Sequence, residues 1–251
     1  MARRAAVIFA ILLSAVTTTA LAQPPGMEPP RWSLGLAVIS SPEPYKGADN
    51  DILVVPAITF QGERFYFRGI LAGYRLWKRG HFEADAILMP RFGGYEADDS
   101  PFLRGMEDRR LGVDLGLNLT WEADRIGLRL APRVDVSGRS QGQELGVEVY
   151  SPIRFGPVRV EPAVGAIWQS ADLANYYYGV RPGEARPGRP AYEPGSTVNL
   201  TGGVFVFSPV TRKLAFQGFV RVNRLGSEIG DSPIVGRDTA VTGLVSLSYG
   251  F

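Results

Sequence analysis

Apolar and polar residues alternate with a period of two through long segments of this 251-residue chain, and this alternation limits its fold more than any other feature. In RRLGVDLGLNLTW (109–121) every second residue from Leu111 to Trp121 is apolar, and the residues between them are small, polar or charged. The segments 126–136, 145–155, 158–168 and 241–251 repeat the pattern. Side chains of a β-strand point alternately to the two faces of a sheet. The sequence therefore predicts an all-β fold.

Two folds share this alternation and differ in which face is buried. In a soluble β-sandwich the apolar face points into the core, whereas in an outer-membrane barrel it meets lipid and the polar face lines the lumen. The alternating segments extend for about 10–13 residues, which suits tilted membrane strands of about 9–11 residues and exceeds the usual strand length of about 5–6. The strand lengths therefore favour the barrel.

The connections between these segments alternate between short and long, as periplasmic turns and outer loops do in bacterial barrels. Placing the short turns in the periplasm predicts a transmembrane antiparallel up-and-down β-barrel of twelve strands, an even number with both termini periplasmic. The expected strands are 32–41, 51–61, 64–69, 70–77, 81–95, 109–121, 126–138, 143–155, 158–170, 197–209, 212–226 and 238–251. The segment 64–77 must then form two unusually short strands, so a barrel of ten strands is the alternative.

Aromatic residues gather at the ends of the expected strands. Near the periplasmic ends lie Trp32, Phe60, Phe65, Trp77, Phe82, Trp121, Phe155, Phe207, Phe216 and Phe251. Toward the outer ends lie Phe92, Tyr95, Trp168 and Tyr176. Two aromatic bands are typical of a membrane barrel, one at each bilayer interface. The chain also ends on a strand, with Tyr249 and Phe251 on its apolar face.

The N-terminus has the features of a secretory signal peptide. Arg3 and Arg4 precede an apolar stretch at 5–16, and Ala20-Leu21-Ala22 forms a cleavage site of the A-x-A kind. The apolar stretch is too short for a stable membrane-spanning helix, which needs about 20 residues. The predicted organisation is a signal peptide at 1–22, a Pro-rich periplasmic lead at 23–31 and an outer-membrane barrel at 32–251. The chain has no cysteine, which excludes disulfides and a lipid-anchored lipoprotein.

Charged residues on the polar faces are expected to line the lumen. They are Asp114, Arg129, Arg133, Asp135, Glu148, Arg154, Arg159, Glu161 and Arg221. Because unpaired interior charges are costly, a network of ion pairs that fills a narrow barrel is one interpretation. A selective pore is the other. A barrel of ten to twelve strands is much narrower than an open porin of about 16–18 strands, which favours the filled lumen.

The sequence has few features that would support catalysis, cofactor binding or nucleic-acid binding. A Ser–His hydrolase would need a serine and an acid beside the single histidine, His81, but His81 lies in a short turn at the expected periplasmic rim, which is more typical of an interfacial turn residue. Glu96, Asp98 and Asp99 form an acidic loop, which is more typical of a solvated surface than of a catalytic site. The net charge of +2 is too small to indicate nucleic-acid binding. We expect a non-enzymatic protein without a cofactor or metal.

The longest loop, 171–196, is rich in tyrosine and proline. Long loops of this kind are often functional, and rigid amphipathic tyrosine rings suit contacts with protein or glycan. A lid folded over the barrel mouth explains the same composition. Both interpretations stay open at the level of sequence.

At these loops the chain resembles the MipA/OmpV family of outer-membrane proteins, also called MltA-interacting proteins. The resemblance rests on PEPYKG, RFYFRG, DDSPFLRGMEDR, YYYGVRPGEA with RPAY, and DSPIVG, which occur in this order between residues 42 and 236. The motif residues that could contact a partner are Pro44, Tyr45, Gly47, Asp99, Ser100, Pro101, Arg109, Tyr177, Tyr178, Gly179, Tyr192, Asp231, Ser232 and Pro233.

The resemblance implies an outer-membrane barrel that acts as a scaffold between a murein lytic transglycosylase and a murein synthase, and other members of the family are linked to adhesion. It supplies no catalytic residue. An outward-facing adhesin or a narrow transport pore is the alternative function. The resemblance also implies that the C-terminal Phe251 is the signal by which the barrel assembly machinery recognises the chain before it inserts among outer-membrane lipids.

Overall fold

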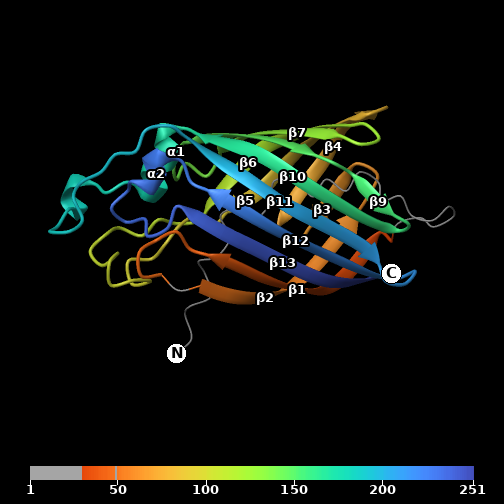
Figure 1. The fold of residues 1–251 in the computed structure, drawn as a ribbon, viewed down its shortest axis with the longest axis horizontal. Coiled ribbons are helices and arrows are strands. Elements are labelled where there is room, and N and C mark those ends of the chain that lie inside the picture. Colours follow the sequence, from red (N-terminus) through yellow and green to blue (C-terminus); the bar gives the residue numbers. More distant parts are fainter. Residues whose placement is uncertain (1–29, 49) are drawn as a thin grey trace.

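The chain forms a closed antiparallel β-barrel in a computed structural model that describes residues 30–48 and 50–251 (Figure 1). The predicted signal peptide and residues 23–29 of the lead lie outside the described residues. The strands are β1 (Trp32–Pro42), β2 (Asn50–Gln61), β3 (Phe65–Arg68), β4 (Leu71–Arg79), β5 (Phe82–Arg91), β6 (Gly112–Glu122), β7 (Gly127–Asp135), β8 (Gln143–Tyr150), β9 (Ile153–Phe155), β10 (Val158–Gln169), β11 (Thr197–Pro209), β12 (Leu214–Arg224) and β13 (Thr239–Gly250).

Consecutive strands pair with each other, except β8 and β9, and this series includes the ladder between β10 and β11. One further ladder, between β1 and β13 with Ser33 opposite Gly250, closes the cylinder. Strands β8 and β9 both pair with β10 and are two parts of one interrupted strand. The barrel therefore has twelve strands, which confirms the predicted count over the alternative of ten, and the short segment 64–77 does form two strands.

Prolines mark the places where ladders are interrupted. Pro162 on β10 lies opposite the break between β8 and β9, because Val160 pairs with Ile153 and Ala163 pairs with Tyr150. Pro132 on β7 lies where the β6–β7 ladder skips between the Gly116–Arg133 pair and the Leu119–Leu130 pair. A proline has no N–H to donate, so it is tolerated where a ladder hydrogen bond is already missing.

The sequence predicted no helix, and here the structure differs. The long loop contains α1 (Ala171–Tyr178) and a 3-10 turn (Pro182–Glu184), and α2 (Ser227–Gly230) lies in the last outer loop. The α1 helix begins at Ser170, whose side chain accepts a hydrogen bond from the Leu173 N–H. Within the described residues no helix is long and apolar enough to cross a membrane.

The two faces of the strands have the polarity expected of a membrane barrel. Apolar side chains on the outer face are exposed, for example Leu36, Ile52 and Val164, and the alternate residues point inward. At the rim with the short turns, aromatic rings form a band through the contacts Trp32–Phe60, Trp77–Phe82 and Tyr249–Phe251, with ring centroids 4.7, 6.3 and 5.3 Å apart. Short turns face the periplasm in bacterial barrels, so we assign this rim to the periplasmic side.

The predicted aromatic bands need three corrections. Phe207 on β11 is buried and points inward rather than toward lipid. Tyr95 and Tyr176 do not belong to an outer band, because the first is almost fully buried and the second packs against the loops that cover the barrel mouth. Position along a strand places an aromatic residue near a rim, but its register decides which face it occupies.

Candidate functional site at the outer mouth

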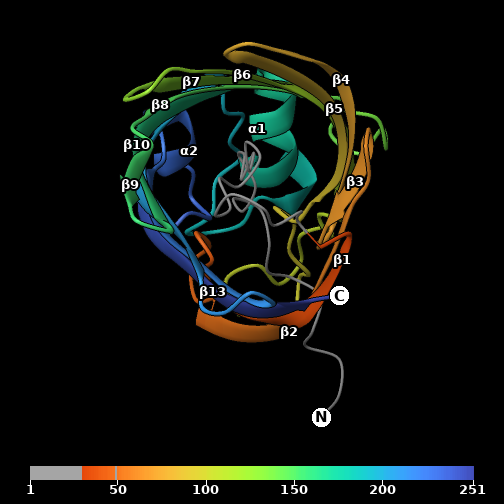
Figure 2. The ribbon, with the colours of Figure 1, turned by 90° about the vertical axis from the view of Figure 1, so that its right-hand side faces the viewer.

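Long loops fold together over the outer mouth of the barrel and form an apolar plug. Viewed along the barrel, α1 and α2 lie within the outline of the strands (Figure 2). We define the plug by its buried core residues: Tyr45, Tyr95, Leu103, Met106, Leu173, Ala174, Tyr177, Tyr178, Val180, Leu225, Ile229, Ile234 and Val235. The long loop therefore serves as a lid, which is one of the two interpretations that the sequence left open.

Tyrosines hold loops together that are distant in the sequence. The Tyr45 hydroxyl donates to the Gly93 carbonyl at 2.7 Å, and the Tyr45 ring packs on Tyr95 and Tyr178 with centroids 4.7 and 5.9 Å away. Burial raises the pKa of Tyr45 well above its ordinary value and raises the pKa of Tyr178 to about 12. These hydroxyls therefore stay neutral at physiological pH and suit an apolar core.

A buried ion pair fastens the long loop to the preceding outer loop. Both carboxylate oxygens of Glu184 accept from the Arg109 guanidinium, at 3.0 and 2.9 Å, and both side chains are almost fully buried. The same carboxylate accepts the backbone N–H groups of Glu107 and Arg181 at 2.9 Å each. Burial alone would raise the pKa of Glu184, but these hydrogen bonds outweigh it and hold the pKa below its ordinary value.

A second arginine of the plug was not singled out from the sequence. Arg189 is among the most deeply buried side chains and donates to the carbonyls of Phe102, at 2.6 Å, and Glu184, at 2.7 Å. A buried cation that bonds only backbone carbonyls fixes the path of a loop and leaves little of its charge for a ligand. No local pattern distinguishes this role, because Arg189 and the exposed Arg186 stand in nearly identical local contexts.

Most motif residues make contacts within the plug and do not form an outward surface. Ser100 Oγ donates to the Lys46 carbonyl and Ser232 Oγ to the Tyr178 carbonyl, each at 2.6 Å, while the Tyr192 hydroxyl donates to the Glu228 carbonyl at 2.9 Å. Gly47 has a positive φ of 74° beside Ser100, a conformation that favours glycine.

The remaining motif residues act through their backbones or lie at the surface. The carbonyls of Pro44, Pro101 and Pro233 accept from Gly236 N–H, Arg186 and Lys46, respectively. The Gly179 N–H ends α1 by donating to the Asn175 carbonyl. Asp99 and Asp231 are exposed. The motif therefore specifies how the loops close over the mouth.

Inside the barrel, ion pairs link strands across the lumen. Arg129 on β7 contacts Glu148 at 2.7 Å and Glu161 at 2.6 Å, and Glu148 also contacts Arg221 on β12 at 3.0 Å. Arg159 extends this chain through contacts with Glu161 and Glu122. Because β8 and β12 are not adjacent, the Glu148–Arg221 pair crosses part of the lumen.

A second group of charges lies toward the outer mouth, and two of its members were missed from the sequence. Arg91 on β5 contacts Asp114 at 2.6 Å and Glu144 on β8 at 2.9 Å, and Glu144 also contacts Arg133 at 3.1 Å. Arg91 and Glu144 are not among the charges predicted to line the lumen, although each lies on the inward face of its strand. The strand register, which places both residues on inward faces, is the feature that would have identified them.

Two residues expected in the lumen lie elsewhere. Asp135, at the outer end of β7, accepts hydrogen bonds from Ser137, Ser140 and Gln141 and so shapes the next outer turn. Arg154 lies on the exposed stretch of β9. In both cases the strand ends or is interrupted near the residue, so the alternation no longer places its side chain in the lumen.

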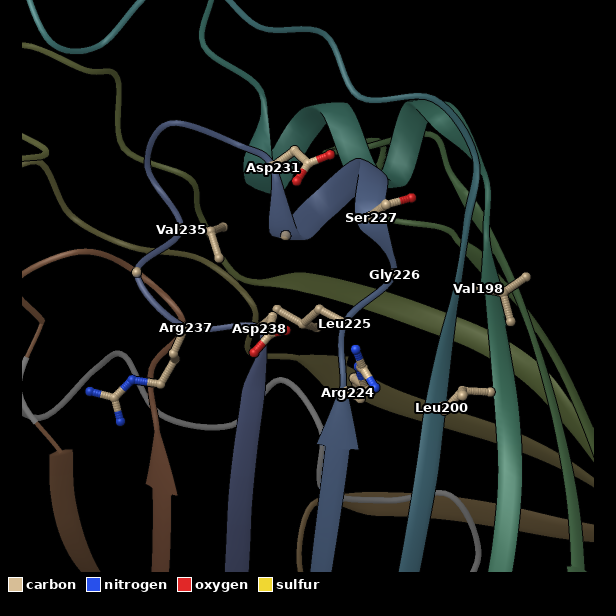
Figure 3. A pocket seen from close by; sticks show the side chains of 12 residues that line it. Val198, Leu200, Arg224, Leu225, Gly226, Ser227, Asp231, Val235, Arg237 and Asp238 are labelled. Atoms are coloured by element: carbon tan, nitrogen blue, oxygen red, sulfur yellow. The ribbon is translucent and has the colours of Figure 1, made fainter.

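A cavity of about 640 Å³ lies between the outer end of β11, the end of β12 and the α2 loop (Figure 3). Its lining combines the apolar Val198 and Leu200 with Arg224 and Asp238. Arg237 and Asp231 add one more charge of each sign. The balanced charges favour neither an anion nor a cation, so the cavity by itself does not define a ligand.

The residues considered for catalysis are separate from these clusters. His81 Nδ1 lies 2.7 Å from the Glu122 carbonyl at the periplasmic rim and is exposed. Asp99 accepts from the Glu96 N–H, and Asp108 accepts from the Ala97 N–H, so these carboxylates shape their own loop. Among the described residues no group of three or more acidic or histidine side chains could hold a metal ion.

Comparison with known proteins supplies the family. The family model described as MltA-interacting protein MipA matches residues 34–251. The chain belongs to this family. It is 30% identical to the MltA-interacting protein of Escherichia coli K12 over 228 residues, which cover 88% of this chain and 90% of that protein. It is 31% identical to the outer membrane protein OmpV of Vibrio cholerae over 157 residues, which cover 62% of this chain and 60% of the relative.

Among solved structures, a KdgM porin covers 86% of this family member and 99% of its own chain, with 8% identity and a TM-score of 0.46. The relatives named as outer membrane proteins and the barrel fold place this MipA-family protein in the outer membrane. The resemblance and the location predicted from the sequence are thereby confirmed. The names of the relatives and the fold point to a non-enzymatic barrel protein.

Proposed function

We propose that this protein is a non-enzymatic scaffold of the outer membrane that holds murein-remodelling enzymes, a lytic transglycosylase and a murein synthase, at the inner face of the membrane. The observation that carries the proposal is the 30% identity, over nearly the full length of both chains, to a protein named for its interaction with MltA. The family match at 34–251 covers the barrel from the third residue of β1 onward, with all of its loops.

The geometry of the barrel supports a scaffold more than a channel. The plug covers the outer mouth, and the ion pairs between β5, β7, β8 and β12 cross the lumen below it. The buried Tyr177 and Tyr178 are unavailable as adhesive side chains. A partner on the murein side meets the periplasmic rim, which offers the lead 23–31, the short turns and the exposed aromatic band.

A pull-down with purified lytic transglycosylase tests the proposal. The full chain in detergent should retain the enzyme, and a variant without residues 23–31 should retain less if the lead forms part of the contact. Substitutions in the turns at 62–64 and 123–125 test the rest of the rim, and equivalent substitutions in the outer loop 97–108 are the matched control. Failure of the full chain to retain either murein enzyme would overturn the scaffold.

The alternative functions have separate tests. Steady single-channel conductance in planar bilayers would favour a narrow transport pore. Loss of cell adhesion after replacement of the exposed part of the long loop, at 181–183 and 185–188, would favour an adhesin. We expect neither result, because the mouth is plugged and the tyrosines face inward.

A further inference from the structure

A cation lies on the lipid-facing side of the barrel wall, at its outer end. Arg224 is the last residue of β12, and the alternate residues before it, Val220 and Val222, are exposed on the outer face. Arg224 is exposed as well, and its partner in the ladder with β11 is Leu200, which is also exposed. Among the described residues, the Arg224 guanidinium has no hydrogen-bond or ion-pair partner. This arginine, placed among apolar side chains, therefore keeps its charge available for a ligand.

Arg224 lies at the depth where the bilayer passes from acyl chains to headgroups. Trp168 of β10 is exposed on the outer face at the outer end of its strand and pairs with Val198 of β11. Tryptophan on the lipid-facing side of a barrel is enriched at this interface. Val198 lies two residues from Leu200, the partner of Arg224, so these residues share one narrow layer. A long arginine side chain in that layer extends its guanidinium to the headgroups.

The cavity of about 640 Å³ beside α2 lies in this layer (Figure 3). Val198 and Leu200 line it from the outer face of β11 and are half-exposed, whereas Leu225 and Val235 line it from the plug and are buried. The cavity therefore has an apolar wall that continues into the lipid-facing surface of the barrel and an apolar base that the plug closes. Its volume lies within the range of pockets that hold small ligands, about 300–1,000 Å³.

The polar part of the lining carries both signs of charge. Asp238 lies beside Arg224, because the Asp238 carbonyl accepts the N–H of the next residue, Leu225, at 2.7 Å. Asp231 and Arg237 complete the charged lining, and all four charged side chains are exposed. A ligand that fits this lining carries a negative and a positive group close together. It also brings an apolar part for the adjoining wall.

We propose that this cavity binds the headgroup of a lipid that carries a phosphate and a primary ammonium, such as phosphatidylethanolamine. Arg224 donates to the phosphate, and the carboxylates of Asp231 and Asp238 accept from the ammonium. Hydrogen bonds between ionised groups are stronger than those between neutral groups. The acyl chains follow the exposed apolar surface at Leu200 and Val222. Lipid is the occupant because this wall of the cavity is part of the surface that faces the bilayer.

The same chemistry separates this lipid from two close relatives. A headgroup with a phosphate and no ammonium, as in phosphatidylglycerol, leaves the carboxylates without a partner and places a negative charge near them. A headgroup with a quaternary ammonium, as in phosphatidylcholine, has the same charges but no N–H to donate. These two lipids, with identical acyl chains, are therefore the matched control ligands.

Native mass spectrometry of the folded protein in detergent measures the binding of the three lipids. We expect phosphatidylethanolamine to bind more tightly than either control lipid. Arg224→Gln should weaken its binding about tenfold, as expected for the loss of a hydrogen bond to a charged group. Arg139→Gln is the matched control, because Arg139 is an exposed arginine of a different outer turn, and it should bind as the wild type does. Heat-modifiable mobility checks that each variant is folded.

The double variant Asp231→Asn with Asp238→Asn should lose most of the preference for phosphatidylethanolamine over phosphatidylcholine. Free phosphoethanolamine should not displace the lipid at equal concentration, because it lacks the acyl chains, and displacement would overturn the assignment of the ligand as a lipid. Equal binding of the three lipids, preference for phosphatidylglycerol, or unchanged binding in Arg224→Gln would overturn the proposal. These measurements involve no murein enzyme, so they test the lipid site separately from the scaffold.

Discussion

Replacement of Glu184 by alanine should open the plug while the barrel stays folded. The substitution leaves the Arg109 guanidinium buried without its carboxylate, and it removes the acceptor for the backbone N–H groups of Glu107 and Arg181. Loss of one partner of a buried ion pair costs about 3–5 kcal/mol. Since about 1.4 kcal/mol corresponds to a tenfold change in an equilibrium constant, the opening equilibrium of the plug should shift at least about a hundredfold.

Hydrogen exchange in the outer membrane measures this opening. Backbone amides at 92–111 and 171–196 should exchange faster in Glu184→Ala, and amides in β6 and β7 should keep their protection, because loops open locally. The control is Glu107→Gln in the exposed Arg181–Glu107 pair, where about 1 kcal/mol or less is expected. Unchanged loop exchange in Glu184→Ala would refute the assignment of this pair as the fastening of the plug.

The same pair predicts the effect of acid. The pKa of Glu184 lies below its ordinary value of 4.5 in the folded plug, so its contribution to stability is complete above that value. The contribution is lost as the pH falls from about 4.5 through the lower folded-state pKa. Loop exchange in the wild type should accelerate over this range more than in Glu184→Gln, which has no carboxylate to protonate.

Three further outcomes follow from the contacts. Alkaline pH should loosen the plug. Because the pKa of Tyr45 is raised, its contribution to the stability of the plug is complete below the ordinary value of 10.0 and declines as the pH rises above it. Tyr45→Phe should weaken the pH dependence of hydrogen exchange in the loops. Gly127→Ala should lower the free energy of unfolding of the barrel by about 1–3 kcal/mol, because the added Cβ lies 2.1 Å from the Tyr150 ring. Gly146→Ala is the control, because its added Cβ meets only ordinary contacts. Heat-modifiable mobility at increasing temperature measures the stability of both variants. Deletion of Phe251, exposed at the periplasmic rim, should reduce the fraction assembled in the outer membrane more than it changes the melting of the assembled barrel.

The strands of the barrel wall could be predicted from the sequence because the alternation of apolar and polar residues is a local feature of each strand. A strand with one lipid face and one lumen face must alternate with a period of two, and its length must match the bilayer. Strand number and rims follow from these constraints and from the turn lengths. Helix α1 escaped prediction because it spans only eight residues, too few for a clear helical period.

The charged network shows what the alternation of apolar and polar residues cannot predict. Alternation places Arg129, Glu148 and Glu161 on inward faces, and these residues do pair. It could not show that Arg91 contacts Glu144 on β8 as well as Asp114 on the adjacent β6, since β5 and β8 are not neighbours and their contact depends on how the sheet curves. Asp135 was misplaced because the sequence does not mark where β7 ends.

The barrel with its lipid-facing apolar surface follows from the sequence, because the alternation and length of each strand and the lengths of the turns are local features of the chain. The role of the loops depends on contacts that form only after the chain has folded. Tyr45 bonds Gly93, and Arg109 bonds Glu184, across long stretches of chain that closure of the barrel brings to one mouth.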